Sequence, residues 1–376
     1  MKIVVTMDSF KGSLTAVQAC DCVKKGILSV VPDSDVATFP AADGGEGTLE
    51  ILLSLGVVEK AETVVLDPLG REIVAYYGRS GRLAVIEMAQ ACGLMLLSDA
   101  ERNPLKASSY GLGQLIKAAL DEGVDRLFIC IGGSAVNDGG LGMLRGVGAI
   151  FRDIAGGEVI YAEDLSRIKS VNLSGFDRRI NEAEITVLCD VKNPLCGDCG
   201  ATMVYGPQKG AGEKELAILE EGLLNFASVS ADATGDDLSQ KCGAGAAGGV
   251  GFALMTYLGA EYVGGAKAVL DLTGLEKALD GADILITGEG RLDRQTANGK
   301  IPYEAAKIAK AKNIPVVMLA GCVENGLSCE PLCADACVST VTDIVIGGDF
   351  KKGAAERLTA ASENLMRTVA IGMRLK

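Results

Sequence analysis

Histidine is absent from this chain of 376 residues, and its absence excludes several kinds of active site. A Ser-His-Asp triad, a His-Cys pair, a phosphohistidine and any metal site with an imidazole ligand are ruled out. If the protein uses a general base, we therefore expect an aspartate, a glutamate or a lysine.

Basic residues are fewer than acidic ones: 36 lysines and arginines stand against 49 aspartates and glutamates, for a net charge of -13. This balance argues against nucleic acid or an anionic membrane as a partner. An anionic small molecule would need local cations. Lys11, Lys209, Arg291 and Lys300 lie inside glycine-bearing motifs, where they can supply that charge.

Long apolar runs are also missing. Each run is interrupted well short of the roughly 18 residues that a membrane helix needs. Met1 leads directly into Ile3 and Val4 without a basic region or cleavage site. We therefore expect no signal peptide, no membrane span and a cytoplasmic location. The twelve cysteines are scattered through apolar segments, which is typical of buried thiols in a reducing compartment.

The chain does contain a set of loops in which acidic residues stand beside glycines. Each loop follows a short apolar run and precedes a helical pattern. The loops are Met7–Ser13, Ala42–Thr48, Asn137–Gly140 and Thr287–Asp293. In open α/β sheets, ligands bind where strands end and helices begin. Glycine lets backbone N–H groups approach a phosphate, and carboxylates can hold Mg²⁺. The combination indicates phosphoryl transfer.

The apolar pattern predicts an α/β fold that begins with the order βαβα. Residues 2–7 are typical of a buried parallel strand, and an amphipathic helix capped by Ser13 or Thr15 follows. A second strand is expected near 36–39 and a second helix over 48–55. This order is typical of a parallel sheet, and the same alternation returns after residue 275.

The middle of the chain follows a different pattern. Runs over 73–77 and 83–88 predict a hairpin, which does not belong in a doubly wound parallel sheet. We expect a discontinuous, doubly wound Rossmann-like parallel-sheet domain, residues 1–64 plus 283–376, with a second α/β domain, residues 65–282, inserted. Within the insert the pattern predicts helices over 109–120, 141–151 and 213–229, and strands over 125–131 and 184–189. The glycine-rich stretch 243–251 is expected to open a further helix that runs through residue 258.

Three other functions stay open at this point. Gly243–Gly248 has the letters of a dinucleotide-binding loop, but an oxidoreductase would need a strand directly before it. Cys196 and Cys199, together with Cys329, Cys333 and Cys337, could form a zinc site or a redox sensor, although a packing role is the simpler reading. A non-catalytic binding protein would leave the crowded carboxylates unexplained. Neither a Walker A loop nor the protein-kinase signatures are present.

Six motifs make the sequence resemble the type I bacterial glycerate kinase family, in the family's order from about residue 1 to 320. They are Asp8–Ser13, Ala42–Thr48, Gly132–Gly140, Cys189–Leu195, Gly206–Ala211, and Thr287–Asp293 with Gln295, Thr296, Gly299 and Lys300. The resemblance implies ATP-dependent phosphorylation of D-glycerate, usually at the 2-hydroxyl, with Mg²⁺. It also implies two α/β domains, one inserted in the other, with the active site in a cleft between them.

Our hypothesis assigns these loops to in-line transfer of the ATP γ-phosphoryl group. Lys11 and Arg291 would neutralise the substrate carboxylate or the transferring group, and Asp8 or Asp293 would deprotonate the hydroxyl. The expected metal ligands are Asp43, Glu46, Asp190, Asn193 and Glu289. The expected substrate or nucleotide contacts are Ser9, Phe10, Ser13, Gly44, Gly45, Ser134, Asn137, Asp138, Lys209, Gly288, Gly290 and Lys300. The sequence leaves open phosphorylation at the 3-hydroxyl and assembly into a homo-oligomer.

Overall fold

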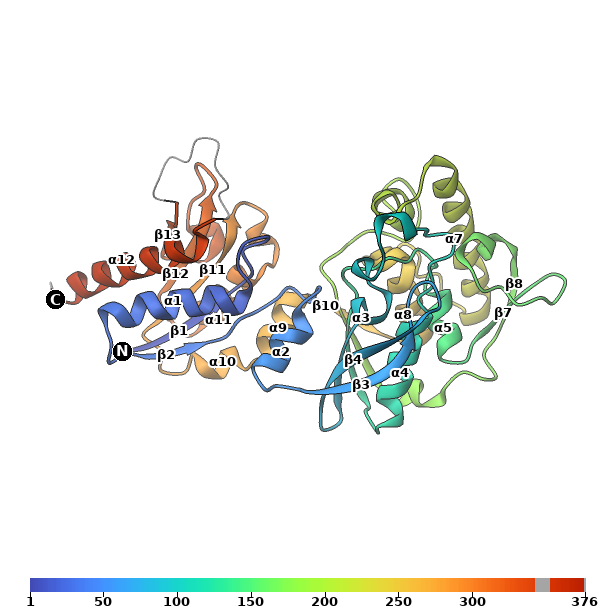
Figure 1. Cartoon of the computed structure of the whole chain (residues 1–376), viewed down its shortest axis with the longest axis horizontal. Helices are drawn as coiled ribbons and strands as arrows, with labels where there is room; N and C mark the ends of the chain where they lie inside the picture. Colours follow the sequence, from blue (N-terminus) through green and yellow to red (C-terminus); the bar gives the residue numbers. More distant parts are fainter. Residues whose placement is uncertain (342–351, 375–376) are drawn as a thin grey trace. The chain divides into compact units, whose positions relative to one another are not determined.

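The computed structural model describes residues 1–341 and 352–374. The chain divides into two compact units (Figure 1). The first is discontinuous and contains residues 1–43 and 266–376, and the second is the continuous segment 44–265. The fold is therefore α/β with one unit inserted in the other, as expected. The expected cleft stays a prediction.

The first unit is built on a five-stranded sheet whose strands all run parallel, in the order β13-β12-β11-β1-β2. The strands are β1 (Lys2–Met7), β2 (Asp35–Thr38), β11 (Ile284–Leu292), β12 (Val316–Val323) and β13 (Ala336–Ser339). The central strands are apolar along their length because helices cover both faces of the sheet. The doubly wound prediction is confirmed for this unit.

Helices α1 (Ala16–Val30) and α12 (Ala354–Arg374) pack against one face of this sheet, in one apolar cluster with Ile3, Val5 and Met7. The other helices of the unit are α9 (Gly265–Leu272), α10 (Leu275–Ala278) and α11 (Ile301–Ala311). Helix α1 begins as predicted after Thr15, whose hydroxyl accepts from the Gln18 N–H while the Gln18 side chain accepts from the Thr15 N–H. This capping box fixes where the chain turns from the first loop into the helix.

The second unit contains a mixed six-stranded sheet in the order β10-β9-β6-β5-β4-β3. Its strands are β3 (Glu59–Leu66), β4 (Glu72–Ser80), β5 (Leu83–Glu87), β6 (Arg126–Cys130), β9 (Glu184–Leu188) and β10 (Glu261–Val263). Strands β5, β6, β9 and β10 are parallel, and the β3–β4–β5 meander is antiparallel. The predicted hairpin is therefore β4–β5.

The helices of the second unit enclose a single large apolar cluster with this sheet. They are α3 (Ala89–Cys92), α4 (Tyr110–Asp121), α5 (Leu141–Gly146), α6 (Ala201–Tyr205), α7 (Glu213–Thr234) and α8 (Val250–Leu258). Helix α2 (Thr48–Ser54) contributes no residue to this cluster and packs on β4 and β5. A separate antiparallel pair is formed by β7 (Ile150–Asp153) and β8 (Ile168–Asn172). Short 3-10 helices occupy Leu94–Leu96, Asp99–Glu101, Ala162–Arg167, Arg178–Glu182, Pro207–Lys209, Ala246–Gly249, Thr296–Asn298 and Glu330–Leu332.

The helix predicted over residues 141–151 is wrong in its second half. Helix α5 ends at Gly146, and Gly148 has a φ of 103°, a left-handed conformation that interrupts the helix. The apolar residues after it, which look helical by spacing, form strand β7 instead.

The domain boundaries also differ from the expected ones after residues 64 and 282. Strand β3 pairs with β4 along its whole length, and helix α2 packs on β4 and β5. Residues 44–64 therefore belong with the inserted unit. At the other end the insert stops at Gly265, so α9 and α10 belong almost entirely to the first unit.

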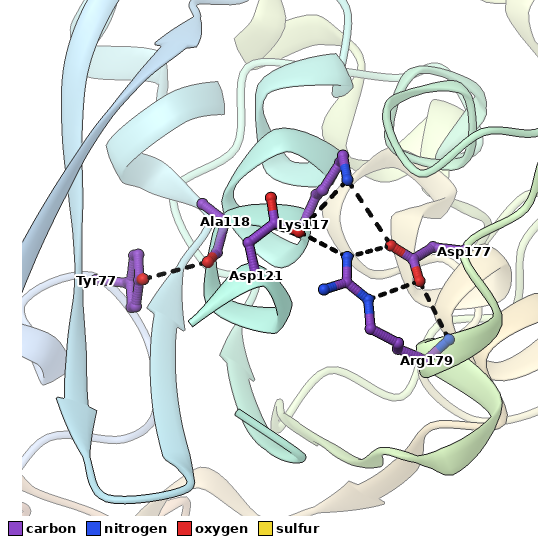
Figure 2. Close-up of polar contacts among 6 residues, drawn as sticks. All are labelled: Tyr77, Lys117, Ala118, Asp121, Asp177 and Arg179. Carbon is purple, nitrogen blue, oxygen red and sulfur yellow. Dashed lines mark hydrogen bonds and ion pairs between the residues drawn. The ribbon is translucent and has the colours of Figure 1, made fainter. Parts of the chain in front are cut away.

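A network of exposed ion pairs lies at the end of α4 in the second unit (Figure 2). Arg179 donates to Asp177 at 2.6 Å and to Asp121 at 2.7 Å, and Lys117 lies 3.5 Å from Asp121. The bonds to Asp177 and Asp121 raise the pKa of Arg179, and the bond from Arg179 lowers the pKa of Asp121. The network joins α4 to the 3-10 helix Arg178–Glu182, at the strand ends opposite to the glycine-rich loops, so its role is structural.

Candidate functional site

In the first unit, three predicted acidic residues lie on or after adjacent strands of the parallel sheet. Asp8 comes directly after β1, Asp43 lies in the segment after β2, and Glu289 lies near the end of β11. Because β1 lies between β2 and β11, these carboxylates gather at one edge of the sheet.

Asp8 is a buried carboxyl group with a raised pKa. It is 9% exposed, and its Oδ1 accepts from the Ser9 N–H at 2.6 Å. Burial raises the pKa of Asp8 from 3.8 to about 6; the Ser9 bond and Lys11 oppose this, while the charges of Asp43 and Glu289 add to it. A carboxyl group that titrates near neutral pH is suited to accept a proton.

Glu289 lies at the centre of a second group of charges. It is 7% exposed, and its two oxygens accept from the Thr296 hydroxyl at 2.7 Å and from the Lys300 ammonium at 3.2 Å. Lys300 Nζ also lies 3.8 Å from Asp293 Oδ1, and Arg291 Nε lies 3.7 Å from Asp293 Oδ2. The residues predicted after β11 are thus brought together, with Glu289 inside the group and the Arg291 side chain 63% exposed.

The loop after β1 packs closely on β11. The Asp8 N–H donates to the Gly288 carbonyl at 2.9 Å. A Cβ at Gly288 would lie 1.8 Å from the Leu319 carbonyl oxygen, so glycine is required there. Phe10 is buried, with its backbone against Gly290, and Ser13 donates from its hydroxyl to the Phe10 carbonyl. This packing leaves the Lys11 side chain exposed beside the carboxylates.

In the second unit, the loop Gly44–Thr48 lies across the carboxyl ends of parallel strands. A Cβ at Gly44 would lie 2.8 Å from Leu188, at the end of β9, and one at Gly132 would lie 3.0 Å from Gly45. Glu46 lies over Gly133: its Oε2 would be 3.1 Å from a Cβ there. The predicted loops 44–48 and 132–134 are therefore in contact.

Glu87, which the sequence analysis passed over, anchors this loop. It is the last residue of β5, is 2% exposed, and accepts from the Gly47 N–H at 2.7 Å and from the Leu49 N–H at 3.2 Å. Burial raises the pKa of Glu87, and its two N–H partners partly offset that shift. An acidic residue at the carboxyl end of an apolar strand was the signal that could have identified it.

Asp138 is buried and fully engaged by the protein. Its carboxylate accepts from the N–H and hydroxyl of Ser109, each at 2.8 Å, and from the N–H groups of Gly140 and Gly142 at 3.0 and 3.1 Å. It is 2% exposed. Asp138 therefore joins the starts of α4 and α5, and its side chain does not reach the surface.

Lys209 is also inside the second unit, with 2% of its surface exposed. Its ammonium donates to the Val136 carbonyl at 2.7 Å and to the Ser134 hydroxyl at 3.1 Å. Burial lowers the pKa of Lys209 to about 7, against the opposing charge of Asp138. Asn137 is fully buried beside them and donates to Thr202 at 2.9 Å. Asn137, Asp138 and Lys209 are thus buried beneath the loop that follows β6 and hold it in place.

The predicted ligands after β9 have different environments. Asp190 is exposed, and its Oδ1 accepts from the Gly265 N–H at 3.2 Å. Asn193 uses its side chain to shape the loop, since it donates to the Cys199 carbonyl at 2.7 Å and accepts from Tyr205 at 2.9 Å. Asp190 is thus the better placed of the two to bind a cation.

The protein can supply only part of the coordination shell of a Mg²⁺ ion. Among residues 1–341 and 352–374, no three acidic or cysteine side chains form a ready cage for a metal ion. Mg²⁺ usually takes one or two carboxylates and completes its shell with water and substrate phosphates. Asp43 in the first unit, and Glu46 and Asp190 in the second, are exposed carboxylates of the kind that such a metal uses. Burial is the main cause of the raised pKa of Asp8, and the charges of Asp43 and Glu289 add to it, so a cation beside these carboxylates would be favourable.

The structure bears on two of the rival functions. Residues 235–243 form turns after helix α7, so the strand that a dinucleotide loop needs before Gly243 is missing. The cysteines are free thiols and form no metal cluster in the described part of the chain. Cys329 and Cys333 flank a 3-10 helix and Cys337 lies in β13, so the three do not share one helix face. Within residues 1–341 and 352–374, every helix is too short or too polar to span a membrane.

Comparison with known proteins agrees with this geometry. The model of the glycerate kinase family matches residues 3–370. The chain is 44% identical to glycerate kinase of Bacillus subtilis over 328 residues, 86% of each chain. It is 40% identical to glycerate 2-kinase of Escherichia coli over 378 residues, covering 100% of this chain and 99% of that one. The crystal structure of a putative glycerate kinase 2 from Salmonella typhimurium has a TM-score of 0.88 at 41% identity, covering 100% and 99% of the two chains. The chain belongs to the glycerate kinase family and is accordingly an enzyme, a phosphotransferase.

Proposed function

We propose that the enzyme transfers the γ-phosphoryl group of ATP to the 2-hydroxyl of D-glycerate, giving ADP and 2-phospho-D-glycerate, with Mg²⁺ as cofactor. The full-length similarity to a relative named glycerate 2-kinase carries the choice of the 2-hydroxyl. The carboxylates of Asp8 after β1, Asp43 after β2 and Glu289 in the second half of β11 support the choice of these loops as the site of the reaction. We place the reaction in the cytoplasm.

Asp8 is the base in this proposal. It accepts the proton of the 2-hydroxyl as the oxygen attacks the γ-phosphorus, and the bond from that phosphorus to the bridging oxygen of ADP breaks. A pKa of about 6 leaves Asp8 ionised at neutral pH yet more basic than an ordinary aspartate. Asp293 is the weaker candidate, since Arg291 and Lys300 both lie near its carboxylate. The transfer depends mainly on positioning and charge, so a weak base suffices.

Cations of the first unit neutralise the anionic groups. Lys11 and Arg291 are exposed and can reach the glycerate carboxylate or the transferring phosphoryl group. Lys300 is already bonded to Glu289. We therefore assign Lys300 and Glu289 to holding the loop after β11, with Ser9, Gly288 and Gly290 shaping the adjacent backbone.

Asp43, Glu46 and Asp190 would hold Mg²⁺, directly or through water, and the ion would shield the charges of the ATP phosphates. The backbones of Gly44 and Gly45 can approach those phosphates closely. The buried residues Asn137, Asp138 and Lys209 support the loop that carries Ser134, and we do not assign them a contact with ligand.

Incubation with ATP, Mg²⁺ and D-glycerate, coupled to enolase, tests this function. Phosphoenolpyruvate formed without phosphoglycerate mutase is the expected result and identifies the 2-phosphate. Signal that needs the mutase would identify the 3-phosphate instead. Silence in both assays, with ATP unconsumed, would refute the function. Omitting Mg²⁺ should abolish turnover, and L-glycerate serves as the matched control for the acceptor.

A further inference from the structure

The loop Gly44–Thr48 lacks a capping side chain of its own. Helix α2 begins after Gly47, which has a φ of 91° and no side chain to accept from the first N–H groups of the helix. Serine, threonine, asparagine or aspartate usually fills that position. Here the acceptor comes from Glu87, forty residues later in the chain.

This arrangement buries a carboxylate at considerable cost. Glu87 is 2% exposed, burial raises its pKa, and the nearby Glu46 and Glu50 carboxylates raise it further. The two charge-assisted N–H bonds at 2.7 and 3.2 Å compensate for that cost. Gly47 has a left-handed φ, in which a serine or aspartate would be strained, so a local capping side chain is disfavoured at this position. The cap instead comes from another strand, and it ties the start of α2 to the end of β5.

Glu87 is one of three residues at strand ends that fix the Gly44–Thr48 loop, which carries Glu46. Glu87 ends β5, Gly132 follows β6 and Leu188 ends β9, and all three contact the same loop. The loop is thereby fixed over three parallel strand ends, with Glu46 held above Gly133. Without the two Glu87 bonds, the glycines at 44, 45 and 47 would leave this segment free to change conformation.

We infer that Glu87 is a positioning residue of the phosphoryl-transfer site: it fixes the Gly44–Thr48 loop through the Gly47 and Leu49 N–H groups and so places Glu46 toward the Mg²⁺-bound nucleotide. This inference rests on the proposed function. Glu87 itself does not touch substrate.

The test compares Glu87→Gln with Asp67→Asn. Both wild-type carboxylates are 2% exposed and accept two backbone N–H bonds. Asp67, which follows β3 and also accepts from Arg71, holds the turn before β4, and this turn carries no predicted site residue. Glutamine offers one acceptor oxygen and an NH₂ group that faces the second N–H. We expect Glu87→Gln to lower kcat about tenfold to hundredfold by misplacing the loop, while Asp67→Asn keeps wild-type kcat with a comparable loss of Tm.

Hydrogen exchange gives a readout that does not need turnover. In the wild type, Mg·ADP should slow amide exchange over residues 44–55, and Glu87→Gln should remove that protection while Asp67→Asn retains it. Equal protection in both variants, or none in the wild type, overturns the inference. So does a Glu87→Gln kcat equal to that of Asp67→Asn. If Glu87→Gln does not fold, Glu87→Asp, which keeps the charge but shortens its reach, is measured in the same way.

A double-mutant cycle with Glu46→Gln tests whether Glu87 acts through Glu46 or through a nonspecific destabilisation of the fold. If Glu87 acts through Glu46, the double variant should be no slower than Glu46→Gln alone. Losses that multiply would contradict the inference. An enzyme inactive on glycerate but protected by Mg·ADP over 44–55 would refute the proposed function while leaving this inference open to the exchange test.

Discussion

Burial of Asp8 has consequences for both stability and activity. Its folded pKa of about 6 lies above the ordinary value of 3.8, so the ionised carboxylate destabilises the fold. This cost is fully present above about pH 6 and disappears below about pH 4. Asp8→Asn should therefore raise the free energy of unfolding at pH 8 by up to about 3 kcal/mol, and the gain should vanish toward pH 4. Urea titrations in EDTA across this range would measure it.

The same substitution should nearly abolish turnover, because asparagine cannot accept the proton. In the wild type, kcat/KM should fall as the pH drops through about 6, where Asp8 becomes protonated. Asp293→Asn is the matched control. If it rather than Asp8→Asn removes the acid limb of the profile, the base has been assigned to the wrong carboxylate.

Lys11 tests the role of local charge. Its side chain is exposed, so Lys11→Ala should change stability by no more than about 0.5 kcal/mol. By contrast, kcat/KM should fall by about two to three orders of magnitude if Lys11 stabilises the transferring group. Lys25→Ala, an exposed lysine on α1, is the control. Kinetics near the wild type for Lys11→Ala would remove Lys11 from the mechanism.

The crossing of α1 and α12 requires a glycine. A Cβ at Gly26 would lie 2.4 Å from the Thr359 carbonyl oxygen, whereas one at Gly372, also helical, would meet nothing within 4 Å. Gly26→Ala should therefore destabilise the protein by about 1–3 kcal/mol through overpacking, despite alanine's higher helix propensity. Gly372→Ala should be neutral or stabilising by up to about 1 kcal/mol. Differential scanning calorimetry of the two variants would measure this difference in Tm. Similar Tm values for both would contradict the close packing at Gly26.

Elements with a strong local pattern were predictable, and those that depend on distant partners were not. The strand 2–7 and the helix after Thr15 follow from apolar spacing and a capping signal. Strands β7 and β10 are short, and their residues pair with segments that local sequence does not reveal. The site divides in the same way. Asp8 and Asp43 follow strands and were expected, but the burial of Lys209 and the reach of Glu87 to Gly47 depend on tertiary packing.

At the scale of the whole molecule, the two units differ in how their chain is connected. The second unit is one continuous segment with its own six-stranded sheet and apolar cluster. The first needs both ends of the chain, because β1 lies between β2 and β11 and pairs with each. The misplaced boundaries have the same origin: residues 44–64 continue the βαβα pattern along the sequence, yet their strand pairs inside the insert.

This connectivity predicts which fragments fold. Residues 44–265 alone should unfold cooperatively, since their core is complete, whereas residues 266–376 alone should not, because β11 lacks its partner β1. The insert starts and ends side by side: a Cβ at Gly44 would lie 2.8 Å from the Gly265 Cα. Joining residues 1–43 to 266–376 by a few glycines and serines should therefore restore a cooperative fold. Circular dichroism melts check all three chains.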